Sequence, residues 1–201
     1  MKDLAQLILR LALGGLMAGH GAQKLFGAFG GGGLPGTEKM MDKMGFQPAD
    51  RWALAAAGTE FAGGSLTALG LLSPLGPLAV VAPMVVATGT AHAGKPIWSS
   101  QGGAELPVTN LAIAGALFLA GPGAISLDRV FGIKVPWWFS TLALAGTVGG
   151  IAVAVGRKPA PRAMITPAPA ERPSSNGTTT PAPKPIEKAT PVRPERPAGA
   201  R

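Results

Sequence analysis

The sequence has no cysteine and no tyrosine among its 201 residues. Without thiols, this chain by itself forms no disulfide, thiolate metal site or cysteine-based redox centre. Charged residues are also few, at 14%, whereas a typical soluble domain has about 25%. Apolar residues reach 47%, and the mean hydropathy is +0.30. This balance indicates a membrane protein and argues against an ordinary soluble enzyme.

The net charge of +8 lies mostly in the C-terminal region. Residues 157–201 contain nine Lys/Arg and three Asp/Glu, a balance of +6, together with 11 of the 20 prolines and no aromatic residue. Such a segment buries too little apolar surface to offset the entropy of ordering, so we expect a disordered tail. It is either attracted to anionic lipid head groups or is a solvated extension. Nucleic-acid binding is not expected, because the tail has no aromatic ring on which bases could stack.

The rest of the chain is dominated by apolar runs, and a helix needs ~20 apolar residues to cross a ~30 Å hydrocarbon core. Five segments meet or approach this length: Leu4–Leu25, Trp52–Leu72, Leu75–His92, Leu106–Leu119 and Trp137–Val155. We therefore predict an all-α membrane protein. It has a four-helix transmembrane bundle in residues 1–130, a fifth C-terminal transmembrane helix in 131–156 and a disordered Pro-rich tail in 157–201. The short Ser73-Pro74 turn predicts that the second and third segments form a helical hairpin.

A glycine-rich loop, Gly30–Gly33, follows the first segment. The sequence TEKMMDKM at Thr37–Met44 then predicts a short amphipathic surface helix with Thr37 as its cap. The first segment is not expected to be cleaved as a signal peptide, because Arg10 interrupts its apolar region and no clean cleavage site follows.

Lysine and arginine concentrate on the side where the first segment ends, which by the positive-inside rule is cytoplasmic. With five spans this side receives the basic tail as well as Lys24, Lys39, Lys43, Arg51 and Lys95. The other side receives Lys2, Arg129 and Lys134. We therefore expect a multi-pass protein of the cell membrane with its N-terminus outside and its C-terminal tail in the cytoplasm.

Ionisable residues inside apolar segments are functional candidates, because an unpaired charge in the bilayer core costs several kcal/mol. At about 100° per residue, Arg10, His20 and Lys24 fall within an arc of roughly 80° on one helix. Depth estimates place His20, Lys24, Glu60, His92 and Glu105 in the cytoplasmic half, with Arg10 reaching toward them from the other side. The predicted binding set is thus Arg10, His20, Lys24, Glu60, His92 and Glu105, with no metal site among them.

Each candidate also has a structural interpretation. Arg10 and Glu60 could form a buried ion pair that fixes helix register, and Lys24 could extend to the lipid head groups. His20 could be a hydrogen-bonded interior histidine, and His92 a hydrated helix end. Glu105 could favour a helix N-terminus by its charge. The residues outside this set give weaker signals, although Gly15-x-x-x-Gly19 and Gly146-x-x-x-Gly150 permit close packing or a homo-oligomer.

The string from Arg10 to Gly27, RLALGGLMAGHGAQKLFG, resembles the opening signature of the DoxX family. Glu60 followed by glycines, Glu105-Leu106 and the GPGAISLD string at 121–128 extend the resemblance over about residues 4–130. It implies a small helical bundle of the plasma membrane, loosely associated with redox chemistry or oxidative-stress complexes. The fifth apolar segment and the tail depart from the usual four-span pattern of that family.

The leading hypothesis is an integral membrane subunit of a redox-related assembly that binds quinone or another small ligand in a polar intramembrane pocket. Lys24, His20 and Glu60 could hydrogen-bond the carbonyls of a quinone and exchange its protons. Any thiol chemistry would belong to a redox protein partner, and whether the chain is itself an enzyme stays open. The alternatives are a non-enzymatic membrane scaffold that recruits soluble partners and, with less support, a small-solute transporter. Membrane lipids are expected partners in every case.

Overall fold

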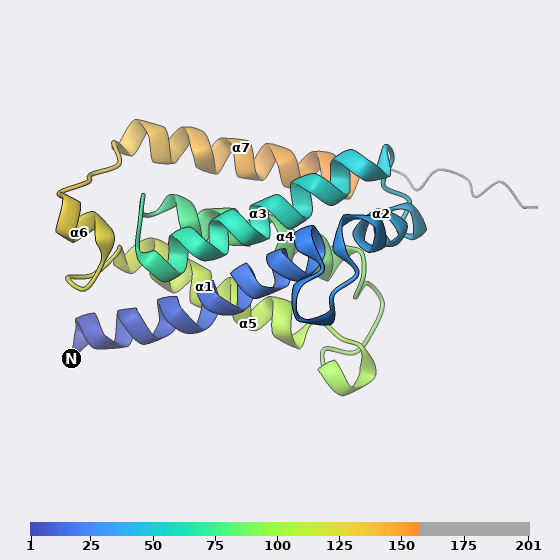
Figure 1. Ribbon diagram of the computed structural model, residues 1–201, viewed down its shortest axis with the longest axis horizontal. Helices are drawn as coiled ribbons and strands as arrows, with labels where there is room; N and C mark the ends of the chain where they lie inside the picture. The colour runs from blue at the N-terminus through green and yellow to red at the C-terminus, as the bar shows by residue number, and fades with distance from the viewer. Residues whose placement is uncertain (157–201) are drawn as a thin grey trace, which may run out of the picture. The chain divides into compact units, whose positions relative to one another are not determined.

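The computed structural model describes residues 1–156, and this part of the chain is helical, without any β-strand (Figure 1). Five long helices follow the five apolar runs: α1 Lys2–Phe26, α3 Ala49–Leu69, α4 Leu75–Gly89, α5 Glu105–Ala120 and α7 Trp137–Gly156. Two shorter helices, α2 Gly33–Lys43 and α6 Leu127–Phe131, and the turns η1 Ala28–Gly30 and η2 Ser99–Gln101 lie between them. The all-α prediction is confirmed for these residues, and the predicted tail lies outside them.

Two of these helices, α1 and α7, are long and apolar enough to cross a membrane. The helices α4 and α5 are apolar but have 15 and 16 residues, about 22–24 Å at 1.5 Å per residue. The α3 helix has 21 residues but carries Asp50, Arg51 and Glu60. The four-plus-one transmembrane arrangement therefore stays a prediction for the three central helices.

Glycines bring α1 and α3 into backbone contact. A Cβ atom added at Gly14 would lie 2.3 Å from the Ala68 nitrogen, and one at Gly21 would lie 2.3 Å from the Phe61 nitrogen. The residue numbers of the contacts fall along α3 as they rise along α1, so the two helices are antiparallel. Small residues permit this close approach in membrane bundles, and it sets the register of the two helices.

The α3–α4 hairpin predicted from Ser73-Pro74 is present, and it is also closely packed. A Cβ atom at Gly63 would lie 2.7 Å from the Ala79 side chain, and one at Gly76 would lie 2.7 Å from the Thr67 nitrogen. The main apolar core then lies between α1, α4 and α5. Its buried members are Leu13, Met17, Val80, Met84, Ala114 and Leu117.

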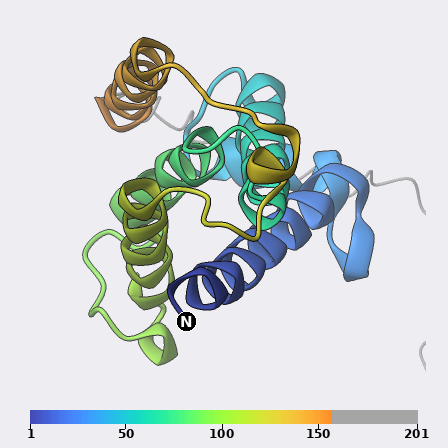
Figure 2. The same ribbon diagram turned by 90° about the vertical axis from the view of Figure 1, so that its left-hand side faces the viewer.

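The α7 helix packs against α4 and lies outside the group formed by α1, α3, α4 and α5 (Figure 2). Ala154 is the buried residue of α7, and it joins a second apolar cluster with Met41, Phe46 and Ala53. Most of the remaining α7 side chains are exposed in the chain itself. The C-terminal part of α7 thus holds this helix to the bundle.

The long helices connect two ends, which we call end A and end B. End A holds Met1, the α3–α4 turn and the α5–α6 loop, which are joined by hydrogen bonds from Gln6 to the Ala120 carbonyl and from the Leu72 amide to Asp128. End B holds residues 27–48 and 90–104 (Figure 1).

The amphipathic helix α2 begins at Gly33, four residues before the predicted cap. Thr37 is therefore inside the helix, where its hydroxyl donates to the carbonyls of Lys24 (3.1 Å) and Gly33 (2.9 Å). The earlier start is possible because Pro35 falls in the first turn, where a missing N–H leaves no helical bond unmade. Thr37 ties α2 to the end of α1 instead of capping it.

Candidate functional site

A buried ion pair joins α1 to α3 near end B. The Lys24 Nζ lies 2.6 Å from both Glu60 carboxylate oxygens. The Glu60 side chain is 5% exposed and that of Lys24 is 27% exposed, so the carboxylate is the enclosed partner. Within residues 1–156 this is the one side-chain ion pair. A paired charge of this kind avoids most of the cost of an isolated buried carboxylate.

This ion pair forms part of the wall of a cavity of about 280 Å³. The rest of the wall is almost entirely apolar and comes from α2, α3, α4, α7 and the segments that directly follow α2 and α4. Its members are Met40, Met41, Met44, Phe46, Trp52, Ala55, Ala56, Thr59, Ala82, Pro83, Val86, Ala87, Thr90, Ala91, Gly150 and Ala154. An apolar cavity with a few convergent polar groups is the usual form of a small-molecule site.

Small residues on the wall leave this space open. Alanines and Gly150 face it where larger side chains would fill it, and a Cβ atom added at Gly150 would meet no atom within 4 Å. Two hydroxyls on the wall, those of Thr59 and Thr90, donate to the carbonyls of Ala55 and Val86 in their own helices. They can therefore only accept a further hydrogen bond from a ligand.

The chemistry of the cavity is that of an amphipathic binding site. The Lys24 ammonium has three N–H donors, and Glu60 accounts for two of them, so one donor is left for a ligand acceptor. Glu60 offers further lone pairs for a ligand hydroxyl. Among residues 1–156 no group of three His, Cys, Asp or Glu side chains is placed to hold a metal ion.

Arg10 is buried, at 3% exposure, but it does not pair with Glu60. Its guanidinium donates to the carbonyls of Pro122 (2.6 Å) and Ile125 at end A. The predicted Arg10–Glu60 pair is therefore wrong. The close glycine packing aligns Arg10 with Gly70, where an added Cβ would lie 1.8 Å from Arg10. Glu60 is ten residues away from that level, or about 15 Å along the helix.

Arg10 instead belongs to a polar network at end A that sequence analysis did not identify. Gln6 donates to the Ala120 carbonyl (3.0 Å), and Asp3 accepts from the Ala124 amide (2.8 Å). The spacing of Asp3, Gln6 and Arg10 places all three on one face of α1. This shared face is the feature of the sequence from which the network could have been predicted. Asp128 completes the network by accepting the amides of residues 72 and 73 at 2.8 and 2.7 Å.

His20 is exposed and does not line the cavity. Its Nδ1 lies 3.0 Å from the Leu16 carbonyl of its own helix. The buried face of α1 passes through Arg10, Met17 and Gly21, and at about 100° per residue His20 lies roughly 80° from Arg10. It was therefore placed in the shared pocket wrongly.

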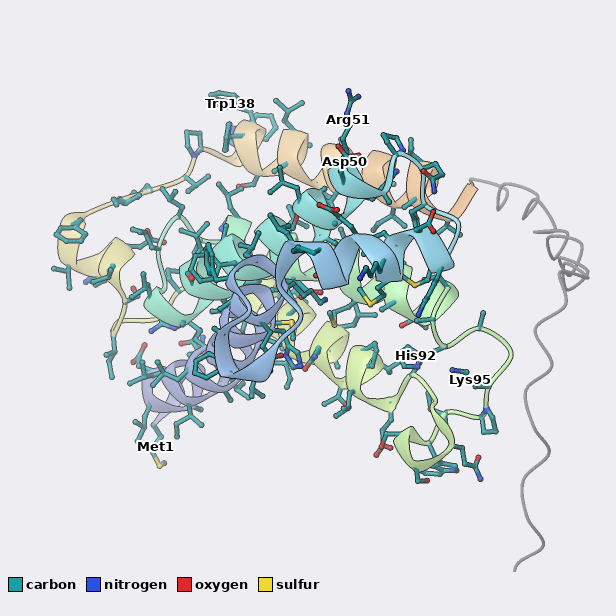
Figure 3. The ribbon with its side chains drawn as sticks, turned by 45° about the vertical axis from the view of Figure 1, so that its right-hand side comes forward. Met1, Asp50, Arg51, His92, Lys95 and Trp138 are labelled. Carbon is teal, nitrogen blue, oxygen red and sulfur yellow. The ribbon has the colours of Figure 1, made fainter. Side chains whose placement is uncertain are left out.

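His92 and Glu105 lie in and next to the loop that joins α4 to α5. The His92 Nδ1 is 2.7 Å from the Gly102 carbonyl, and Glu105 accepts the Ser99 amide (2.9 Å) and hydroxyl (2.8 Å). These two bonds from Ser99 lower the pKa of the Glu105 carboxyl. Figure 3 shows His92 and Lys95 on this loop, at the end of the described residues opposite Met1.

Of the six predicted binding residues, the cavity wall thus contains Lys24 and Glu60. His92 and Glu105 stabilise a loop at the same end, the His20 side chain is on the exposed face of α1, and Arg10 is at end A. The expected single pocket is divided into an ion pair with a cavity at end B and a structural network at end A. The predicted binding role of these residues stays a prediction.

Comparison with known proteins gives a family for the first part of the chain. Residues 5–93 match the family model described as DoxX. No curated protein and no solved structure matches the chain. The matched segment contains most of α1 and all of α2, α3 and α4, and with them both partners of the Lys24–Glu60 pair. Residues 5–93 therefore belong to the DoxX family, a family of membrane proteins, and within the described residues α1 and α7 are long and apolar enough to cross a membrane.

Proposed function

We propose that this protein binds a quinone-like ligand in the cavity at end B and acts as the membrane subunit of a redox-related assembly. The observation that carries the proposal is a buried ion pair on the wall of an otherwise apolar cavity of about 280 Å³. An apolar ligand with no polar group would leave the charges without a further partner. A strongly polar ligand would lose its hydration against methionine, alanine and aromatic side chains.

A quinone ring matches both parts of this wall. Its faces are apolar and its carbonyls are hydrogen-bond acceptors, so one carbonyl can take the remaining N–H of Lys24. In the reduced ligand the hydroxyl can donate to Glu60, and a carboxylate within hydrogen-bond reach is a suitable proton acceptor. Because the chain has no cysteine, we assign any thiol chemistry to a partner protein.

The test is the quinone content of the purified full-length chain, extracted and measured by chromatography with mass detection. Glu60→Gln removes the charge but keeps the shape, and we expect it to lose most of the bound quinone. His20→Ala is the matched control, because His20 lies outside the cavity, and it should retain the wild-type content. Equal quinone content in wild type and Glu60→Gln would contradict the proposal.

A second pair of variants tests the cavity without touching the ion pair. Gly150→Leu places a side chain into the cavity, while Gly146→Leu adds the same side chain to α7 at a position that does not line it. Neither site has an atom within 4 Å of an added Cβ, so both variants should fold. We expect quinone loss in Gly150→Leu and retention in Gly146→Leu, and the reverse would place the ligand elsewhere.

A further inference from the structure

A second cavity, of about 440 Å³, lies at end A between the α5–α6 loop, α6 and the linker to α7. Residues 122–124 and 132–134 line it together with Asp128 and Arg129. It is separate from the ion-pair cavity, with which it shares no residue. Figure 2, which faces this end, shows α6 and the linker leading to α7.

The charges of this second cavity favour an anion. Its wall contains two cations, Arg129 and Lys134, both exposed and without an ion-pair partner among residues 1–156. Its one carboxylate, Asp128, is 4% exposed and already accepts the amides of residues 72 and 73. Buried Arg10 is also close enough to Asp128 for their charges to attract. The two exposed cations therefore dominate the charge that a ligand meets.

The surroundings of the cavity are those of a membrane interface. Exposed apolar side chains flank it along the chain, with Val130 72%, Phe131 66% and Trp137 80% exposed. Trp138 projects outward from the start of α7 (Figure 3), and tryptophan is enriched at the level of lipid head groups. Lys134 precedes α7 by three residues, at most about 10 Å of chain, and the head-group layer is roughly 5–7 Å thick on each side.

We propose that this cavity binds the phosphate of an anionic membrane phospholipid, held between Arg129 and Lys134 while the adjacent apolar side chains contact the acyl chains. The ligand chemistry is a phosphate diester, and the apolar side chains beside the cavity favour the lipid as its source over a soluble phosphate. The site depends on membrane insertion at end A and not on ligand binding at end B, so the two proposals can fail separately.

The experiment is native mass spectrometry of the full-length chain released from detergent micelles that contain phosphatidylglycerol or phosphatidylcholine. We expect a bound-lipid peak with phosphatidylglycerol that falls by about tenfold or more in Arg129→Gln/Lys134→Gln, because each cation near an anionic lipid adds roughly fivefold in affinity. Lys2→Gln is the control: it removes one positive charge at the same end but does not line the cavity, and it should retain the peak. Arg129→Lys, which keeps the charge, should also retain it.

Several results would overturn the proposal. These are equal phosphatidylglycerol binding in the wild type and the double variant, an equal loss in Lys2→Gln, and equal binding of phosphatidylcholine. A third arm adds soluble glycerol 3-phosphate in excess. If it displaces the lipid at comparable concentration, the apolar contacts contribute nothing and the site binds free phosphate instead. Loss of the peak in Arg129→Lys would also overturn the proposal, because a positive charge at this position would then not be enough to hold the lipid phosphate.

Discussion

Two neighbouring glycines on α1 differ completely in what surrounds them. An added Cβ at Gly14 would lie 2.3 Å from the backbone of α3, whereas at Gly15 it would meet nothing within 4 Å. We expect Gly14→Ala to lower the free energy of unfolding by about 1–3 kcal/mol, because the helices must separate. Gly15→Ala should be neutral or stabilising by up to about 1 kcal/mol, because alanine favours the helix.

Chemical denaturation in mild detergent, followed by circular dichroism, measures both variants against the wild type. Equal stability of the two variants would show that α1 and α3 are not in backbone contact. The comparison is sensitive because the two positions share the same helix, the same neighbours in sequence and the same substitution.

For single residues, the sequence correctly indicated which charged side chains face the bundle. It did not indicate which partners they bind. Helical periodicity places Arg10 and Lys24 on one arc, and both face the bundle. It does not give the register of α1 against α3, which is fixed by glycine contacts between two helices distant in sequence. Because register decides whether Glu60 meets Arg10 or Lys24, the ion pair was assigned to the wrong cation.

We predict that the contact holding the loop between α4 and α5 depends on pH. Glu105, the first residue of α5, accepts the amide and hydroxyl of Ser99, and these bonds hold its pKa below the ordinary 4.5. A lowered carboxyl pKa means that the stabilisation is complete above that ordinary value and is lost as pH falls through the lowered one. We therefore expect the Ser99 amide to lose protection from hydrogen exchange on acidification.

Hydrogen exchange followed by mass spectrometry, corrected for the intrinsic rate at each pH, measures this protection. Glu105→Gln is the control, because an amide at this position does not titrate, and its Ser99 protection should be the same at every pH. Protection in the wild type that stays constant as the pH falls well below 4.5 would contradict the role of the carboxylate in holding the loop.

The long helices themselves were predictable because apolar runs, Pro-Gly boundaries and the Ser73-Pro74 turn mark them in the sequence. The five expected segments each coincide with a helix to within three residues at either end. The short elements were not. The α2 helix begins earlier than its amphipathic pattern, and α6 has five residues, too few to show a period. The α2 helix places side chains on the wall of the first cavity and α6 on the wall of the second. The lining of each cavity could therefore not be predicted from the sequence.

At the scale of the whole described chain, cations divide between the two ends as the topology prediction requires. Lys2, Arg129 and Lys134 lie at end A, and Lys39, Lys43, Arg51 and Lys95 lie at end B. A five-span arrangement then places end B in the cytoplasm. The helices α4 and α5 are short for a full crossing, and thinning of the bilayer or extension of flanking side chains can accommodate that difference. Orientation is thus a property of the assembled ends that no single helix specifies.

The absence of cysteine from the whole chain makes the topology directly testable. Single substitutions Lys2→Cys and Lys134→Cys place a thiol at end A, and Lys43→Cys and Lys95→Cys place one at end B. In intact cells we expect a membrane-impermeant maleimide to label the first two, and to label the last two only after permeabilisation. Labelling of Lys2→Cys and Lys134→Cys from opposite sides would show that an odd number of the helices between them crosses the membrane, which excludes the five-span arrangement. Labelling of all four only after permeabilisation would place both ends in the cytoplasm, and the proposed lipid site at end A would then face the inner leaflet.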